Sequence, residues 1–108
     1  MALFNIAPQA TPSAITSAGA CTHSTASVTN TVASALVANA NRKRAMLFNP
    51  PSATTTVVLG FDSTVTATTG VPLAPGQGWV EEGPIIHTGA FHAITSSGTG
   101  LLLCFDWS

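Results

Sequence analysis

Charged side chains are scarce in this sequence: three Lys or Arg and four Asp or Glu occur among its 108 residues. They make up 6% of the chain, whereas about 25% is usual for a soluble domain. The net charge of -1 at pH 7 leaves little long-range field to collect nucleic acid or to steer a charged substrate. A nearly neutral surface also associates readily, so we expect the protein to act with a permanent partner.

A long apolar run is also missing. A membrane-spanning helix needs about 20 consecutive apolar residues, and the apolar start of the chain is interrupted at Asn5 and Pro8. The same stretch has no basic residue, which a signal peptide would carry. We therefore expect neither a secretion signal nor a membrane segment.

Only two cysteines are present, Cys21 and Cys104, and they lie far apart in the sequence. Because no secretion signal is expected, two reduced thiols are favoured, although a disulfide between them stays open.

The motifs of catalysis and of cofactor binding are absent as well. There is no glycine-rich phosphate loop and no nucleophile elbow. Glu81 and Glu82 would point to opposite faces of a strand, so they would not act on one atom. No zinc-finger spacing joins the possible soft or borderline ligands, which are Cys21, His23, His87, His92 and Cys104. The sequence predicts a binding protein with no cofactor and no metal; zinc at these residues, or calcium at Glu81 and Glu82 with Asp62 or Asp106, are lesser alternatives.

What the sequence does contain is a series of short strand patterns separated by turn residues. Pro72 is typical of an edge strand, and Pro75-Gly76 suits the middle of a type II turn. Residues 96–100 are expected to form a hairpin loop. Strands or extended segments are expected at 22–40 (one long or bent strand), 45–48, 54–61, 65–68, 71–74, 79–82, 85–87, 90–95 and 101–107. This spacing predicts an all-β fold, a small antiparallel β-sandwich or a jelly-roll-like barrel, over residues 21–108.

Residues 1–20 precede this domain as an N-terminal arm. Pro8, Pro12 and Gly19 discourage any regular element there. A disordered end and an extended arm that lies on a neighbouring subunit both stay open. Four side chains are more apolar than a solvated tail needs, namely Leu3, Phe4, Ile6 and Ile15.

All the basic charge lies in one run, Arg42, Lys43 and Arg44. A nucleic-acid patch is disfavoured, because the run is short, has no interleaved aromatic residue and belongs to an acidic chain. We expect these charges at a strand edge or a subunit interface, where they set register and partner choice. Their natural partners are the carboxylates of Asp62, Glu81, Glu82 and Asp106.

The two tryptophans are further candidates, because tryptophan is enriched at the centres of protein interfaces. Trp79 is expected at a subunit interface or under the Pro75-Gly76 turn. Trp107 is expected to plug the bottom of the sandwich, or to lie at an interface as well.

A resemblance to a known family of proteins lies in three segments, ANANRKRAMLFNP, VVLGFDSTVTATTGVPLAPGQGW and GAFHAITSSGTGLLLCFDW. They are similar to small β-sandwich accessory proteins of tailed-phage virions, which occur as head decoration (cement) proteins, head fibres or tail-associated modules. The resemblance covers roughly residues 22–107, and its motifs are structural.

The resemblance implies a homo-oligomer, often a trimer, that is made in the host cytoplasm and fixed on the capsid surface. The major capsid protein would be its partner, and Leu3, Phe4, Ile6 and Ile15 of the arm would supply part of the attachment. A receptor- or glycan-binding module of a fibre or tail, with Trp79 in its site, is the second hypothesis. A small metal-dependent or hydrolytic enzyme is the third.

Overall fold

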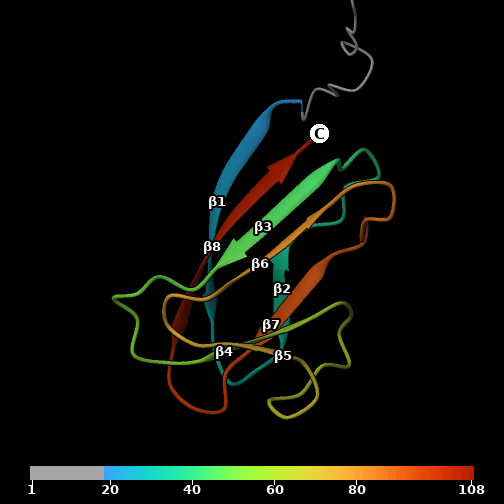
Figure 1. Ribbon diagram of the computed structural model, residues 1–108. Coiled ribbons are helices and arrows are strands. Elements are labelled where there is room, and N and C mark those ends of the chain that lie inside the picture. The colour runs from blue at the N-terminus through green and yellow to red at the C-terminus, as the bar shows by residue number, and fades with distance from the viewer. Residues whose placement is uncertain (1–18) are drawn as a thin grey trace, which may run out of the picture.

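The computed structural model describes residues 19–108, and every regular element in this range is a β-strand (Figure 1). The strands are β1 (Cys21–Val28), β2 (Ala33–Leu36), β3 (Arg44–Phe48), β4 (Val57–Gly60), β5 (Val71–Leu73), β6 (Gly78–Glu82), β7 (Phe91–Ile94) and β8 (Gly100–Trp107).

The strands form two antiparallel sheets of four strands each (Figure 1). Sheet A has the order β1-β8-β3-β6, and sheet B has the order β2-β7-β4-β5. The predicted all-β fold of two antiparallel sheets is confirmed. The arm lies outside the described residues except for Gly19 and Ala20, and Ala20 already pairs with Ser108 next to β1.

The long strand predicted over residues 22–40 is wrong, because the chain changes sheet in its middle. β1 belongs to sheet A and β2 to sheet B. Between them, the Thr29 hydroxyl oxygen accepts a hydrogen bond from the Thr31 N–H at 3.2 Å. Such local bonds from threonine compete with strand pairing and favour a turn, which the alternating pattern alone did not reveal.

The strand predicted at residues 65–68 is also wrong, for a similar reason. The Asp62 carboxylate accepts from the Thr64 N–H at 2.9 Å, and the Thr69 hydroxyl accepts from the Thr66 N–H at 2.9 Å. The segment therefore turns back on itself and places Val65 against Gly60, where a Cβ added to the glycine would lie 2.3 Å from the Val65 Cβ. The Val65 side chain fits here because Gly60 has no Cβ.

The hairpin predicted at residues 96–100 is instead a crossing between the sheets, since β7 lies in sheet B and β8 in sheet A. The Thr95 hydroxyl donates to the Gly98 carbonyl at 2.8 Å and holds this connection. The Pro75-Gly76 turn is confirmed: Gln77 N–H donates to the Ala74 carbonyl at 2.9 Å, and Gly76 has a φ of 88°. Pro72 lies on the edge strand β5, as predicted.

The core lies between the two sheets. It is formed by Val28, Leu36, Ala45, Leu47, Val57, Leu59, Leu73, Phe91, Ala93, Leu102 and Cys104. Asn49 is also fully buried, directly after β3, and its amide donates to the carbonyls of Thr55 at 2.9 Å and Leu73 at 2.8 Å. These two bonds satisfy buried carbonyl groups and fix the end of β3 beside sheet B.

Candidate functional site

The interior strand β8 presents two different faces. Its inward-facing residues are Gly100, Leu102, Cys104 and Asp106, and all four are buried. Its outward side chains are Leu101, Leu103, Phe105 and Trp107, which are at least partly exposed. The outward set is larger and more apolar than the inward one, whereas a solvated sheet face normally carries polar residues.

The neighbouring strands extend this outward surface, because cross-strand partners share a face of the sheet. Met46 and Phe48 of β3 pair with Phe105 and Leu103, and Val80 of β6 pairs with Met46. We call this surface the apolar face; its members are Met46, Phe48, Val80, Leu101, Leu103, Phe105 and Trp107.

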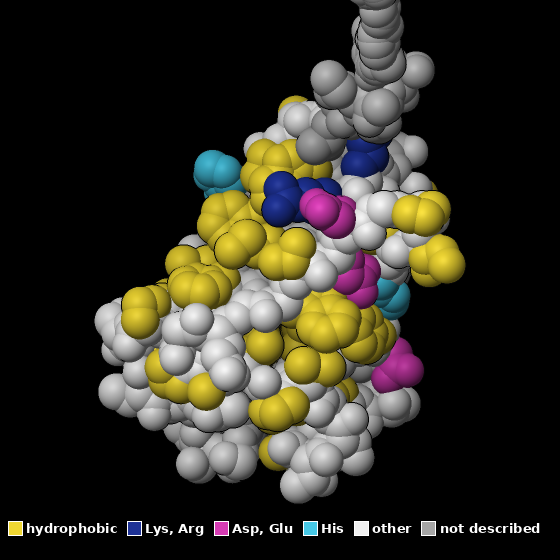
Figure 2. All heavy atoms as spheres, in the orientation of Figure 1, with side chains coloured by type: hydrophobic (Ala, Val, Ile, Leu, Met, Phe, Trp, Pro, Cys, Tyr) yellow, Lys and Arg dark blue, Asp and Glu magenta, His cyan; other side chains and the backbone are white. Residues whose placement is uncertain are grey.

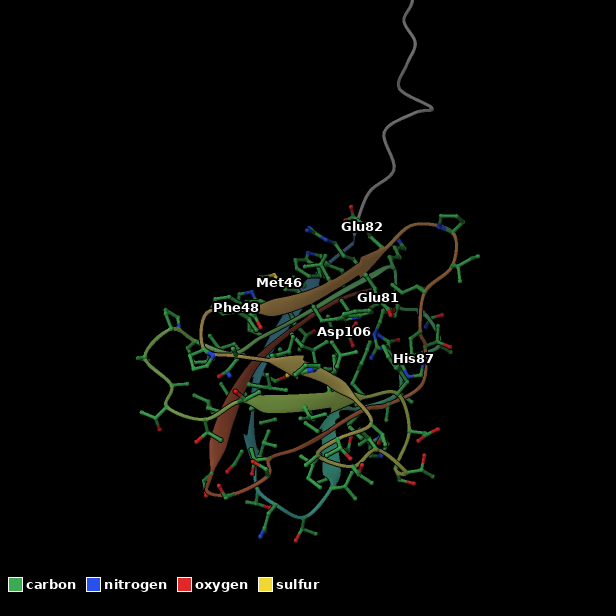
Figure 3. All side chains as sticks on the ribbon, turned by 60° about the horizontal axis from the view of Figure 1, so that its bottom comes forward. Met46, Phe48, Glu81, Glu82, His87 and Asp106 are labelled. Atoms are coloured by element: carbon green, nitrogen blue, oxygen red, sulfur yellow. The ribbon has the colours of Figure 1, made fainter. Side chains whose placement is uncertain are left out.

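The figures show the apolar face from two directions. Hydrophobic side chains gather over β8 and β3 in the space-filling view (Figure 2). Met46 and Phe48 lie on the outward side of sheet A, and Glu81 and Asp106 lie on the side of sheet B (Figure 3). Val80 is 48% exposed and Leu101 is 41% exposed, so large apolar side chains meet solvent at two strands of one sheet. A contiguous apolar surface of this kind usually marks a binding site for another protein.

Aromatic contacts give the apolar face a fixed shape. The rings of Phe105 and Trp107 stack with centroids 6.3 Å apart, and the His23 ring of β1 meets Phe105 edge-on at 5.2 Å. Beside them lies a hollow of about 370 Å³, lined by His23, Ser24, Thr25, Leu103 and Phe105. The surface therefore combines packed rings with a depression that a partner side chain can fill.

One end of the apolar face is charged. The Arg44 guanidinium lies 4.7 Å from the centre of the Trp107 ring, as in a cation–π contact. Its Nε is 2.9 Å from Glu82 Oε1, and both side chains are partly exposed. These two residues lie where the sequence predicted an interface, and Lys43 beside them is exposed.

Arg42 is placed differently from its two neighbours. It is 4% exposed, and its guanidinium binds the Asp106 carboxylate through Nε at 2.9 Å and Nη2 at 3.2 Å. The remaining donors reach the carbonyls of Val37 at 2.7 Å, His87 at 2.7 Å and Gly89 at 3.0 Å. All its bonding capacity is used inside one chain, so it offers no donor to a second subunit.

Glu81 and Trp79 also point inward. Glu81 accepts hydrogen bonds from the His87 N–H at 2.8 Å and from Trp79 Nε1 at 3.2 Å. The Trp79 ring packs against the core and meets Phe61 edge-on at 5.6 Å. Glu82 faces outward, as expected for adjacent residues of a strand. The interface role predicted for Lys43, Arg44, Glu81, Glu82 and Trp79 stays a prediction, and the arm residues Leu3, Phe4, Ile6 and Ile15 lie outside the described part of the chain.

Neither cysteine is bonded to the other: Cys21 is half-buried and Cys104 is fully buried. Burial raises the pKa of the Cys104 thiol to about 11, and its S–H lies 3.6 Å from the Ala35 carbonyl. Among residues 19–108, no group of three or more His, Cys, Asp or Glu could hold a metal ion. The same residues contain no helix long and apolar enough to cross a membrane.

The sequence showed the alternation of β8 but not which set faces the core. The composition of the two sets was misleading, because the set with two aromatic rings would ordinarily be assigned to the core and the set with Asp106 to the surface. Comparison with family models, with curated proteins and with solved structures finds no match for this chain.

Proposed function

We propose that this protein is a virion structural protein, a capsid decoration (cement) protein that binds the assembled capsid surface as a homo-oligomer. The observation that carries the proposal is the apolar face, which lies on a sheet whose inner face already forms a complete core. A domain that needs no further burial to fold, yet keeps aromatic rings outward, is suited to binding another protein.

The capsid setting is supported by the resemblance of residues 22–107 to accessory proteins of tailed-phage virions. In this proposal the partners are the major capsid protein and further copies of the chain. Binding to the assembled shell, and not to separate capsid subunits, stabilises the shell by mass action. No catalytic step is part of the proposal.

The glycan-binding alternative draws less support. Its candidate residue, Trp79, donates its ring N–H to Glu81 and packs against the core, so its ring is not an open platform for a sugar.

The test is sedimentation of the purified protein with expanded empty shells of the phage that encodes it, followed by heating of the shells. We expect bound protein and shells that resist heat to a higher temperature. A Val80→Asp variant is expected to lose binding, because it puts a charge into the apolar face.

The matched control is Ile85→Asp. Ile85 is 91% exposed and lies in the loop after β6, outside the apolar face, so this variant should bind like the parent. The absence of shell binding by the parent protein would refute the proposal, as would equal binding by the Val80→Asp variant.

A further inference from the structure

The four edge strands of the two sheets are protected to different degrees. An edge strand exposes unpaired backbone groups, and proteins usually shield it by shortness, proline, charge or an irregularity. β5 has three residues and contains Pro72, and β2 has four residues with a register shift between Ser34 and Leu36. β6 ends in Glu81 and Glu82.

β1 has none of these devices. It is eight residues long, with the sequence CTHSTASV, and it contains no Lys, Arg, Asp, Glu, Pro or Gly. Its pairing with β8 continues from Cys21 to Val28 without any shift. Within the described sheets β1 is thus the one edge that is open to another strand along its whole length.

The free backbone groups of β1 can be identified. Ala20 and Ser108 exchange both N–H···O bonds, each 3.1 Å long. Bonded and non-bonded pairs alternate along an antiparallel ladder. The N–H and C=O groups of Thr22, Ser24, Ala26 and Val28 therefore face β8. The groups that point to the open edge belong to Cys21, His23, Thr25 and Ser27.

From these observations we infer that β1 pairs antiparallel with β1 of a second copy, so that two sheets A join across a two-fold axis at Ser24. The four residues whose backbone groups point to the open edge are placed symmetrically about Ser24. In this register Cys21 faces Ser27 of the second copy and His23 faces Thr25, so every free group of these residues finds a partner.

The side chains fit this arrangement. Ser24 faces its own counterpart across the axis, and Thr22 faces Ala26, so only small side chains meet on the inward side. A groove of about 480 Å³ runs between β1 and β2, lined mainly by small residues such as Ser24, Ala35 and Ala38. β1 contains no Lys, Arg, Asp or Glu, so two copies of β1 can pair without repulsion between like charges.

The pairing also joins two functional surfaces. His23 and Thr25 line the hollow beside Phe105 on the apolar face. Joining the two strands therefore places two apolar faces side by side on one continuous sheet. The inference and the proposed function have only the assembly of several copies in common. The tests of the inference use no shells, so the two can fail separately.

Cysteine cross-linking tests the register directly. In a Cys21→Ser, Cys104→Ala background, Ser24→Cys puts a thiol opposite its own counterpart, at a non-hydrogen-bonded pair where Cα atoms are about 4.5 Å apart. This separation permits a disulfide. We expect mild oxidation to give a covalent dimer, and the matched Thr22→Cys variant to stay monomeric on a denaturing gel.

A backbone test uses proline. Thr25→Pro removes one N–H that points to the open edge and leaves the ladder with β8 intact, a position that edge strands tolerate. Light scattering should show half the mass of the parent particle, while Thr25→Val, which keeps the N–H, should keep the parent mass. In the parent, the amides of His23 and Thr25 should exchange with solvent as slowly as those of Thr22 and Ser24.

A parent protein that is monomeric at all concentrations, or strictly trimeric, would overturn the inference. Fast exchange of the His23 and Thr25 amides in an oligomer would overturn it as well. Protein that pairs through β1 but does not bind shells would refute the decoration role alone. Protein that binds shells as a monomer would refute the pairing, and with it the homo-oligomer in the proposed function, but not the decoration role.

Discussion

On sheet B the chain covers the outward side of β4 itself, whereas on sheet A no described segment covers the outward side of β8. Residues 61–70 fold back so that Val65 lies over Gly60 and Gly70 lies against Val58. Val58 and Val65 are buried as a result. Phe105 and Trp107 on sheet A have no such cover. Among the described residues, a segment of the chain covers the outward side of sheet B at β4, and none covers the outward side of sheet A at β8.

Because of this difference, apolar residues on the outward sides of the two sheets should contribute differently to the stability of the isolated domain. Covering the outward side of β4 contributes to the stability of the isolated domain. If a partner covers the apolar face, as proposed, that burial contributes only in the assembly, so substitutions there should change assembly more than folding.

The interior of sheet A should be the most sensitive place. Replacing Arg42 by Leu leaves the Asp106 carboxylate buried, with Asn39 Nδ2 still donating to it at 3.3 Å. Removing one partner of a buried pair costs about 3–5 kcal/mol. Urea denaturation should show this loss, and Arg42→Leu combined with Asp106→Leu should recover only part of it, because the buried charge is removed while the carbonyls of Val37, His87 and Gly89 lose their donor. A single Arg42→Leu variant as stable as the parent would contradict the buried-pair account.

Two valine substitutions compare the outward faces directly. Val65 is 8% exposed, so Val65→Asp buries an unpaired charge and should lower the free energy of unfolding by roughly 2–4 kcal/mol. Val80→Asp, on the apolar face, should change it by roughly 0.5 kcal/mol or less, as at other surface positions. If both variants lowered the free energy of unfolding equally in dilute, unassembled protein, the apolar face would matter for folding as much as the covered side of β4, which would contradict the comparison.

The pH dependence of the free energy of unfolding should reveal the burial of the Cys104 thiol on the inward side of β8. Burial raises the pKa of Cys104 to about 11 from 9.0 in an unfolded chain, so the neutral thiol is favoured in the folded state. The associated stability is present below pH 9 and is lost as the pH rises through 9 toward 11. Thermal melts of the parent and of Cys104→Ala between pH 8 and pH 11 should converge as the pH rises; a constant difference would contradict this.

The smallest effect is expected at the charged end of the apolar face. Glu82→Gln removes the partly exposed ion pair with Arg44, which contributes only ~0–1 kcal/mol to the stability of the chain. Denaturation should show almost no change. A loss of several kcal/mol would mean that this pair holds the fold rather than bordering a binding surface.

The sequence predicted the all-β fold class, the edge position of Pro72 on β5 and the turn at Pro75-Gly76. These features depend on local turn chemistry and on alternation, which a sequence displays directly. It did not predict the turns at Thr29–Thr31 and at Thr64–Thr69, because threonine favours strands and yet bonds to nearby backbone when the chain bends.

The candidate site was predicted only in part. Arg44 and Glu82 border the apolar face, whereas Arg42 is buried. Asp106 was one of the four carboxylates expected as partners of the basic run, but it lies 64 residues from Arg42, and the sequence does not reveal which of the four pairs with Arg42 or that the pair is buried. The apolar face itself was missed for a different reason. Alternation separates the two sets of β8 residues, and the usual rule then assigns the more apolar set to the core. That rule fails at β8, where the buried set contains Gly100, Cys104 and Asp106 and the partly exposed set contains Phe105 and Trp107.

The most direct test of the central statement, that the apolar face is covered by protein in the working assembly, is hydroxyl-radical footprinting. Dilute unassembled protein and shell-bound protein would be labelled in parallel, with Phe61, which lies off the apolar face and is 39% exposed, as the internal control. We predict that shell-bound protein loses labelling at Met46, Phe105 and Trp107 and keeps it at Phe61. Unchanged labelling of Met46, Phe105 and Trp107 in shell-bound protein would contradict the account.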